Sequence, residues 1–149
     1  MENKNMKIAI CGSISFTDKI NVISEQLKEV GHVVEIPLTS QKILSGQLSM
    51  QEFEKEKSVN GDGSFRKIQD DVIRRYYNLI AGVDCILVVN DGKKGISGYV
   101  GGNTFLEMGF AYVLNKKIFL LNAIPDMQYT DEIKAMQPTV LNGDLSKIK

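Results

Sequence analysis

Short, continuous apolar runs are spaced along most of this chain. Runs of four or five apolar residues, bounded by turn residues, are typical of strands that are buried on both faces of a sheet. The segments predicted to form strands are 7–11, 32–36, 85–89, 118–121 and 139–141. The first of them ends at Gly12-Ser13, which indicates a tight turn after a buried strand.

The stretches between these runs have helical periodicity. Residues 20–30 place Ile20, Ile23 and Leu27 on one stripe with charged residues outside it, and Gly31 ends the pattern. Further helices are predicted over 64–82, 103–115 and 130–136. The expected buried face of the 64–82 helix consists of Phe65, Ile68, Val72, Tyr76, Leu79 and Ile80.

Alternating strands and helices predict the fold class. We expect residues 1–149 to form a single α/β domain with a doubly wound, mostly parallel sheet of the Rossmann or flavodoxin type. The expected strand order is 2-1-3-4-5, with helices on both faces. In such sheets ligands bind beyond the carboxyl ends of the strands, where the strand order reverses.

This rule brings three separate segments to one predicted crevice. They are Gly12, Ser13 and Ile14 after the first strand, Asn90 and Asp91 after the third, and Gly101, Gly102, Asn103 and Thr104 at the start of a helix. Glycine lets a backbone approach a ligand closely, and the amides of a helix N-terminus attract anions or hydroxyl groups. These residues are therefore the candidates for substrate binding.

Residues 38–63 depart from the alternating pattern. They are polar, rich in Gln, Lys, Glu and Ser, and end in the loop Asn60-Gly61-Asp62-Gly63. Ser49-Met50-Gln51-Glu52 has the capping-box pattern, which predicts a short helix beginning there. Two interpretations stay open at this point. The segment could be a lid-like insertion over the site, or a solvent-exposed insertion without a role in it.

Composition excludes several classes of protein. Lys+Arg and Asp+Glu both total 18, so no overall charge favours nucleic acid or a membrane surface. No apolar run approaches the roughly 18 residues of a membrane span, and the polar N-terminus has no signal-peptide core. Cys11 and Cys85 lie in core strands, which favours reduced thiols and a cytoplasmic location. The single histidine, His32, makes zinc sites and histidine triads improbable, and no metal or cofactor is expected.

Glu107 stands out because it is the one charged side chain between Gly95 and Asn115. Its helix is apolar nearly all round, and an unpaired buried carboxylate is costly. One interpretation is a capping box, in which Glu107 accepts from the Thr104 amide. The other is a functional carboxylate that faces the crevice, where it could act as a nucleophile at a sugar carbon.

Other polar residues have similar alternatives. Asp84 precedes the third strand, at the edge of the sheet opposite the expected crevice, and could be a cap or turn residue. Asp91 lies at the favourable end of that strand but could belong to a simple Asn-Asp-Gly turn. Lys93 and Lys94 could reach a phosphate, although a solvated pair is the commoner arrangement.

Three motifs together resemble the nucleoside 2-deoxyribosyltransferase superfamily. They are Ile10-Cys11-Gly12-Ser13-Ile14, Asp84-Cys85-Ile86-Leu87-Val88-Val89 and Gly102-Asn103-Thr104-Phe105-Leu106-Glu107-Met108-Gly109-Phe110-Ala111. The first motif is most similar to the branch of 2′-deoxynucleoside 5′-monophosphate N-glycosidases. The similarity is specific over about thirty residues, as judged from these short motifs alone.

The resemblance implies roles for particular residues. It makes Glu107 the nucleophile at the anomeric carbon and gives Asp84 a part in the active site, although Asp91 could fill that part instead. It places Gly12, Ser13 and Ile14 under the sugar or phosphate. The chain also departs from the family, because its first strand lacks an aromatic residue and Gly101 occupies a position where Asp or Ser is usual. Asn103, Thr104 or Ser97 are the available substitutes.

The expected activity is cleavage or transfer at the N-glycosidic bond of a nucleoside or nucleoside 5′-monophosphate. Glu107 would form a glycosyl-enzyme, and Asp84 or Asp91 would protonate or orient the departing base. A nucleotide-binding module without turnover, a phosphoribohydrolase of the lysine-decarboxylase-like type and a flavodoxin-like FMN protein are the alternatives. Because Phe105, Phe110, Tyr112 and Val113 cannot all face one sheet, a homodimer or larger homo-oligomer is also expected.

Overall fold

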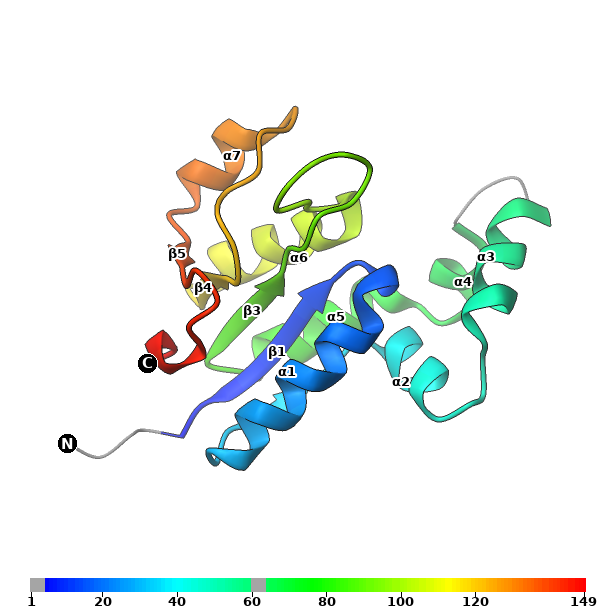
Figure 1. The fold of residues 1–149 in the computed structure, drawn as a ribbon, viewed down its shortest axis with the longest axis horizontal. Coiled ribbons are helices and arrows are strands. Elements are labelled where there is room, and N and C mark those ends of the chain that lie inside the picture. The colour runs from blue at the N-terminus through cyan, green and yellow to red at the C-terminus, as the bar shows by residue number, and fades with distance from the viewer. Residues whose placement is uncertain (1–4, 60–63) are drawn as a thin grey trace.

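The computed structural model describes residues 5–59 and 64–149, and it contains one five-stranded sheet (Figure 1). All strand pairs are parallel, and the order is β2-β1-β3-β4-β5. The strands are β1 (Lys7–Gly12), β2 (Val33–Glu35), β3 (Cys85–Val89), β4 (Lys117–Leu120) and β5 (Thr139–Val140). The predicted α/β class and strand order are confirmed.

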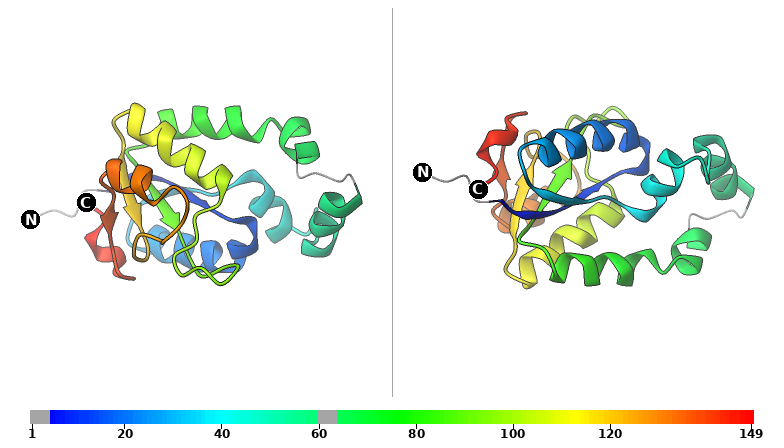
Figure 2. Two further views of the ribbon diagram at one scale, coloured as in Figure 1. Left: turned by 90° about the horizontal axis from the view of Figure 1, so that it is seen from above. Right: turned by 90° about the horizontal axis from the view of Figure 1, so that it is seen from below.

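Apolar side chains of β1 and β3 alternate between two cores, one on each face of the sheet. On one face Ile8, Ile10 and Leu87 pack against α1 (Thr17–Glu29). On the other face Ala9, Cys11 and Val88 pack against α5 (Val72–Ala81), α6 (Gly102–Val113) and α7 (Thr130–Ala135). Figure 2 shows α1 on the side of the sheet opposite α5 and α6. Burial on both faces explains why the strands read as continuous apolar runs.

Three short helices form an arm that projects from one end of the sheet (Figures 1 and 2). They are α2 (Leu38–Leu44), α3 (Met50–Val59) and α4 (Ser64–Gln69). The Ser49 hydroxyl accepts from the Glu52 amide at 3.0 Å, so the predicted cap of a helix starting there is confirmed. The predicted loop at 60–63 lies outside the described residues. We refer to residues 38–59 and 64–69 as the arm.

The prediction of one helix over 64–82 is wrong. The chain forms α4 and α5 with a break at Asp70 and Asp71, where Asp71 has a left-handed backbone with φ of +49°. The break turns α4 out of line with α5, so Ile68 is 75% exposed rather than part of the buried face. Tyr76 and Ile80, which follow the break, are buried as expected.

The remaining segments complete the frame of the sheet. One-turn helices lie at Ile14–Phe16 and Leu145–Lys147. His32 has a structural role, because its Nδ1 accepts from the Met6 amide at 3.0 Å where β1 begins. Cys11 and Cys85 are both buried free thiols. Within residues 5–59 and 64–149, no helix combines the length and apolar character needed to cross a membrane.

Candidate active site

A cavity of about 250 Å³ lies beyond the carboxyl end of β1, between the body of the domain and the arm. It is lined by residues 12–15, 37–39, 53–54, 66–67, 72, 75–76, 93–94, 99, 101–104 and 107. The first two segments follow β1 and β2, and residues 101–107 begin α6. The cavity therefore sits at the edge of the sheet where parallel α/β folds bind ligands.

Glu107 lies in the wall of this cavity and is 6% exposed. Its Oε1 accepts a hydrogen bond from Asn103 Nδ2 at 2.7 Å, one helical turn earlier. Its Oε2 is buried and has no hydrogen-bond partner among the described residues. A buried carboxylate oxygen without a donor is energetically unfavourable, so this atom needs an explanation other than folding.

The capping-box interpretation of Glu107 is wrong. Helix α6 begins at Gly102, its N-cap is Gly101, and no side chain caps it. The Phe105 amide bonds to the Gly101 carbonyl instead, which places Glu107 in the second turn of the helix rather than at the reciprocal position of a cap. The described hydrogen bond of the carboxyl group comes from the Asn103 side chain and not from a first-turn backbone amide, and the group belongs to the cavity wall.

Burial raises the pKa of the Glu107 carboxyl to about 7. The nearby Cys11 thiol and the hydrogen bond from the Asn103 side-chain amide oppose this shift, and the positive charge of Lys67 on the arm opposes it further. The group therefore changes charge near neutral pH. Such a carboxyl is suited to a reaction in which it first attacks as an anion and later leaves the covalent intermediate.

Two buried groups lie near Glu107: the hydroxyl of Tyr76, which lines the cavity, and the thiol of Cys11. The Tyr76 hydroxyl, on α5, donates to the Ile10 carbonyl of β1. Burial raises the pKa of Tyr76 well above its usual range, and the nearby Cys11 and Glu107 raise it further. Burial is also the main cause of the raised pKa of Cys11, followed by Glu107. An aromatic hydroxyl thus reaches this region from α5, although the first strand contains no aromatic residue.

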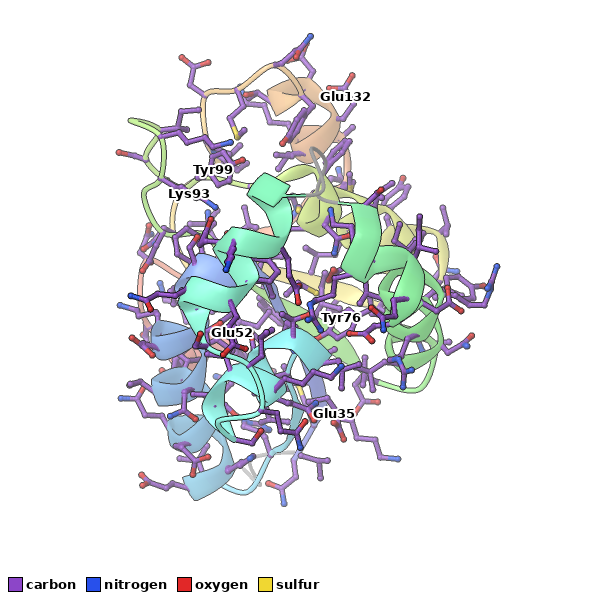
Figure 3. All side chains as sticks on the ribbon, turned by 90° about the vertical axis from the view of Figure 1, so that its right-hand side faces the viewer. Glu35, Glu52, Tyr76, Lys93, Tyr99 and Glu132 are labelled. Carbon is purple, nitrogen blue, oxygen red and sulfur yellow. The ribbon has the colours of Figure 1, made fainter. Side chains whose placement is uncertain are left out.

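Basic side chains surround the mouth of the cavity. Five of them line it: Arg66, Lys67, Arg75, Lys93 and Lys94. Lys93 Nζ donates to Ser13 Oγ at 2.8 Å, so the glycine-rich loop and the turn after β1 are joined at this point. Figure 3 shows Lys93 beside Tyr99, and the lysine nitrogen lies 5.7 Å from the centre of the tyrosine ring. The mouth favours an anionic ligand.

Most of the sequence-predicted site residues meet at this cavity. Gly12, Ser13 and Ile14 line it together with Gly101, Gly102, Asn103, Thr104 and Glu107. Gly12 fits closely, because a Cβ at this position would lie 3.0 Å from the Val89 carbonyl oxygen. Lys93 and Lys94, for which a solvated pair was the commoner expectation, also line the cavity.

Asp84 lies elsewhere, and its assignment to the catalytic machinery does not fit the structure. It precedes β3 at the amino edge of the sheet, and its Oδ2 accepts from the Lys7 amide at 2.8 Å. The Asp84 amide in turn donates to the Lys7 carbonyl. The residue therefore fastens the start of β3 to the start of β1, at the opposite edge from Glu107.

Asn90 and Asp91 also lie outside the Glu107 cavity, contrary to the prediction that they touch its ligand. Asn90 is fully buried, and its side chain accepts from the Asn122 amide at 2.8 Å and donates to the Asn122 and Ala123 carbonyls. Asp91 Oδ1 accepts from Asn122 Nδ2 at 3.3 Å, and Asp91 lines a separate cavity with residues 92, 95–98, 122–124 and 126. Both residues join the loop after β3 to the loop after β4.

The sequence left a lid-like role for residues 38–63 open, but it pointed to no particular cavity residue in the arm or in α5. Phe53 and Glu54 reach the cavity from α3, Arg66 and Lys67 from α4, and Tyr76 from α5. Their patterns are those of ordinary surface or core helix residues, which carry no local signal of a role in a site. No cluster of three potential metal ligands from His, Cys, Asp or Glu occurs in the described part of the chain.

No protein-family model matches this chain, and no curated protein matches it.

Proposed function

We propose that this protein cleaves the N-glycosidic bond of a nucleoside or nucleoside 5′-monophosphate, with Glu107 as the nucleophile. The observation that carries the proposal is the buried Oε2 of Glu107, which lines the cavity and lacks a partner among the described residues. A substrate carbon placed against this oxygen would relieve its unfavourable burial. The resemblance in the sequence motifs supports the same assignment.

The chemistry follows from the surroundings of Glu107. Its ionised Oε2 attacks the anomeric carbon, the base departs, and water or a second base then takes the sugar from the glycosyl-enzyme. The Asn103 amide, bonded to Oε1, fixes the orientation of the carboxylate. The apolar packing around α6 strengthens electrostatic interactions with the developing oxocarbenium charge. Two attacks on the same carbon retain its configuration.

The basic mouth of the cavity supports a phosphorylated substrate. Lys93 and Ser13 are already joined at 2.8 Å, and both present donors to a phosphate oxygen placed between the turn after β1 and the glycine-rich loop. Arg75 and Lys94 line the same opening. We therefore expect nucleoside 5′-monophosphates to be better substrates than the corresponding nucleosides.

The test is release of free base from ribo- and deoxyribonucleoside 5′-monophosphates and from nucleosides, followed by chromatography. The wild-type protein releases base, and Glu107→Gln lowers the rate by about 10⁴-fold or more because the nucleophile is lost. The matched control is Asp84→Asn, which keeps a hydrogen-bond acceptor for Lys7 and leaves the rate within about threefold. Absence of base release from every substrate contradicts the proposal.

A nucleotide-binding module without turnover is the second candidate. It is favoured by the positions of Asp84 and Asp91, because neither carboxylate lines the cavity and each was expected to assist the departing base. Titration calorimetry distinguishes the two candidates. Tight binding of a nucleoside monophosphate without release of base supports the binding module.

A homo-oligomer and a cytoplasmic location remain proposals. Phe105 is used within the chain, since its ring stacks on Tyr129 with 4.4 Å between the ring centres. Tyr112 and Val113 are 52% and 70% exposed, and Leu106 on the same helix is 46% exposed. Exposed apolar residues on one helix support association with a second copy of the chain, which sedimentation equilibrium measures.

A further inference from the structure

Two carboxylates line the cavity within the described part of the chain. Glu107 comes from α6 in the body, and Glu54 comes from α3 in the arm. The two elements approach the cavity from different sides, since α3 projects beyond the end of the sheet (Figure 1). A substrate held in the cavity would therefore have one carboxylate in the body wall and another in the arm wall.

Cleavage of an N-glycosidic bond needs more than a nucleophile. A purine or pyrimidine leaves as a poor anion unless a ring nitrogen or oxygen receives a proton as the bond breaks. The carboxylates of Asp84 and Asp91 are engaged elsewhere, at the amino edge of the sheet and in the second cavity. Among the carboxyl groups that the structure describes at this cavity, Glu54 is the one besides the nucleophile.

The arm is held in place by a compact set of ion pairs. Arg66 contacts Glu56 through Nε at 2.8 Å and through Nη2 at 2.5 Å, and it contacts Asp70 through Nη1 at 3.3 Å. Lys42 Nζ reaches the same Asp70 oxygen at 3.0 Å. These contacts join α2 and α3 to α4 and the break after it, and they hold the helix that carries Glu54 beside the cavity in this structure.

A second contribution of the arm also faces the nucleophile. Burial raises the pKa of Glu107, and the positive charge of Lys67, on α4, partly opposes this rise. Lys67 lines the cavity, as does Phe53 next to Glu54. Thus α3 and α4 both contribute side chains to the cavity that Glu107 lines, which supports a role of the arm in the site.

We propose that Glu54 is the acid that protonates the departing base and the base that later activates water. This inference rests on the proposed glycosidase function. As Glu107 Oε2 bonds to the anomeric carbon, the carbon–nitrogen electron pair passes to the base, which takes the Glu54 proton. Water then bonds to the same carbon and loses a proton to the Glu54 carboxylate, while the electron pair of the ester bond returns to Glu107.

The experiment compares leaving groups in Glu54→Gln. With 2′-deoxyguanosine 5′-monophosphate, we expect the single-turnover rate of base release to fall by about 10²–10⁴-fold, the usual contribution of general acid catalysis. With the N7-methylated form of the same nucleotide, the base is already cationic and leaves without a proton, so the rate stays within about threefold. Glu107→Gln loses both reactions, because each needs the nucleophile.

Glu52→Gln is the matched control. Glu52, labelled in Figure 3, lies on the same helix and is exposed like Glu54, but it does not line the cavity, so this variant keeps the wild-type rate with both nucleotides. A Glu54→Gln protein that cleaves both nucleotides at the wild-type rate, or slows equally on both, overturns the role of Glu54 and leaves the proposed function intact. A wild-type protein that releases neither base overturns the proposed function itself.

Discussion

The body of the domain and the arm are stabilised by different interactions. In the body, β3 is buried at every position, and its side chains pack between α1 on one face and α5 and α6 on the other. In the arm, four of the seven α3 residues whose burial the structure describes are exposed, and ion pairs join α2 and α3 to α4 and the break that follows it. Both regions nevertheless contribute side chains to one cavity.

The difference separates folding from function along the chain. Burial of apolar surface, which contributes roughly 25 cal/mol of free energy per Å², stabilises the body. The apolar residues that it requires form a clear pattern in the sequence. Partly exposed ion pairs contribute at most about 1 kcal/mol each and leave no periodic pattern. The arm is therefore the region that can open or change position without unfolding the sheet.

The largest expected effect comes from truncating one apolar residue in each region. Leu87 is fully buried in β3, so Leu87→Ala should lower the free energy of unfolding by about 3 kcal/mol. Ile68→Ala, in the arm, should change it by less than about 0.5 kcal/mol because Ile68 is 75% exposed. Urea denaturation measures both. Equal losses for the two variants would show that the arm is as firmly packed as the body.

The same difference explains how much of the fold was predictable. Apolar runs determined the five strands, because burial on both faces permits few polar residues, and the strand order followed from the parallel connections. The break between α4 and α5 was missed because Asp70 and Asp71 fit a continuous helical period. Asp70 at the break pairs with Lys42, 28 residues earlier in the chain, and no local pattern contains this contact.

The sequence predicted part of the candidate site, as it predicted most but not all of the fold. The carboxyl ends of the strands and the isolated charge of Glu107 located the cavity and its central residue. Asp84 and Asp91 were misplaced for different reasons. The resemblance suggested Asp84 although its position in the chain put it at the wrong edge, and Asp91 turned toward Asn122 through a side-chain contact that the sequence cannot reveal.

The buried carboxylate of Glu107 is unfavourable for folding of the body. Replacing this residue tests how much its charge lowers the free energy of unfolding. The folded-state pKa of about 7 lies above the ordinary value near 4.5, so the folded state retains a proton that the unfolded state releases. Below about pH 4 both states are protonated and the residue has little effect on stability. As the pH rises from about 4.5 to about 7, stability is lost, and above that range the loss is constant.

We therefore expect Glu107→Gln to be more stable than the wild type at pH 8, by up to about 3 kcal/mol, and equally stable near pH 4. Urea denaturation across this pH range measures the difference. A gain in stability together with loss of base release would identify Glu107 as a residue kept for chemistry at the expense of folding. A difference that does not vary with pH would contradict the raised pKa.

The smallest effect on global stability is expected from the arm. Arg66→Gln removes the guanidinium that joins Glu56 to Asp70, and the hydrogen bond from Arg66 is the main cause of the lowered pKa of Glu56. Global unfolding should change by about 1 kcal/mol or less, since these side chains are partly exposed. Hydrogen exchange of the α3 and α4 amides should nevertheless become faster, because local opening no longer breaks the ion pairs.

The matched control is Lys28→Gln, which removes an exposed pair with Glu25 at 3.6 Å on α1. That pair lies within one helix of the body, so its loss should leave exchange unchanged in α1 and in the arm. If Arg66→Gln accelerates exchange in the arm alone, the arm moves independently of the sheet and Glu54 moves with it. If exchange accelerates equally in β3, the arm and the body unfold together, and the distinction between them fails.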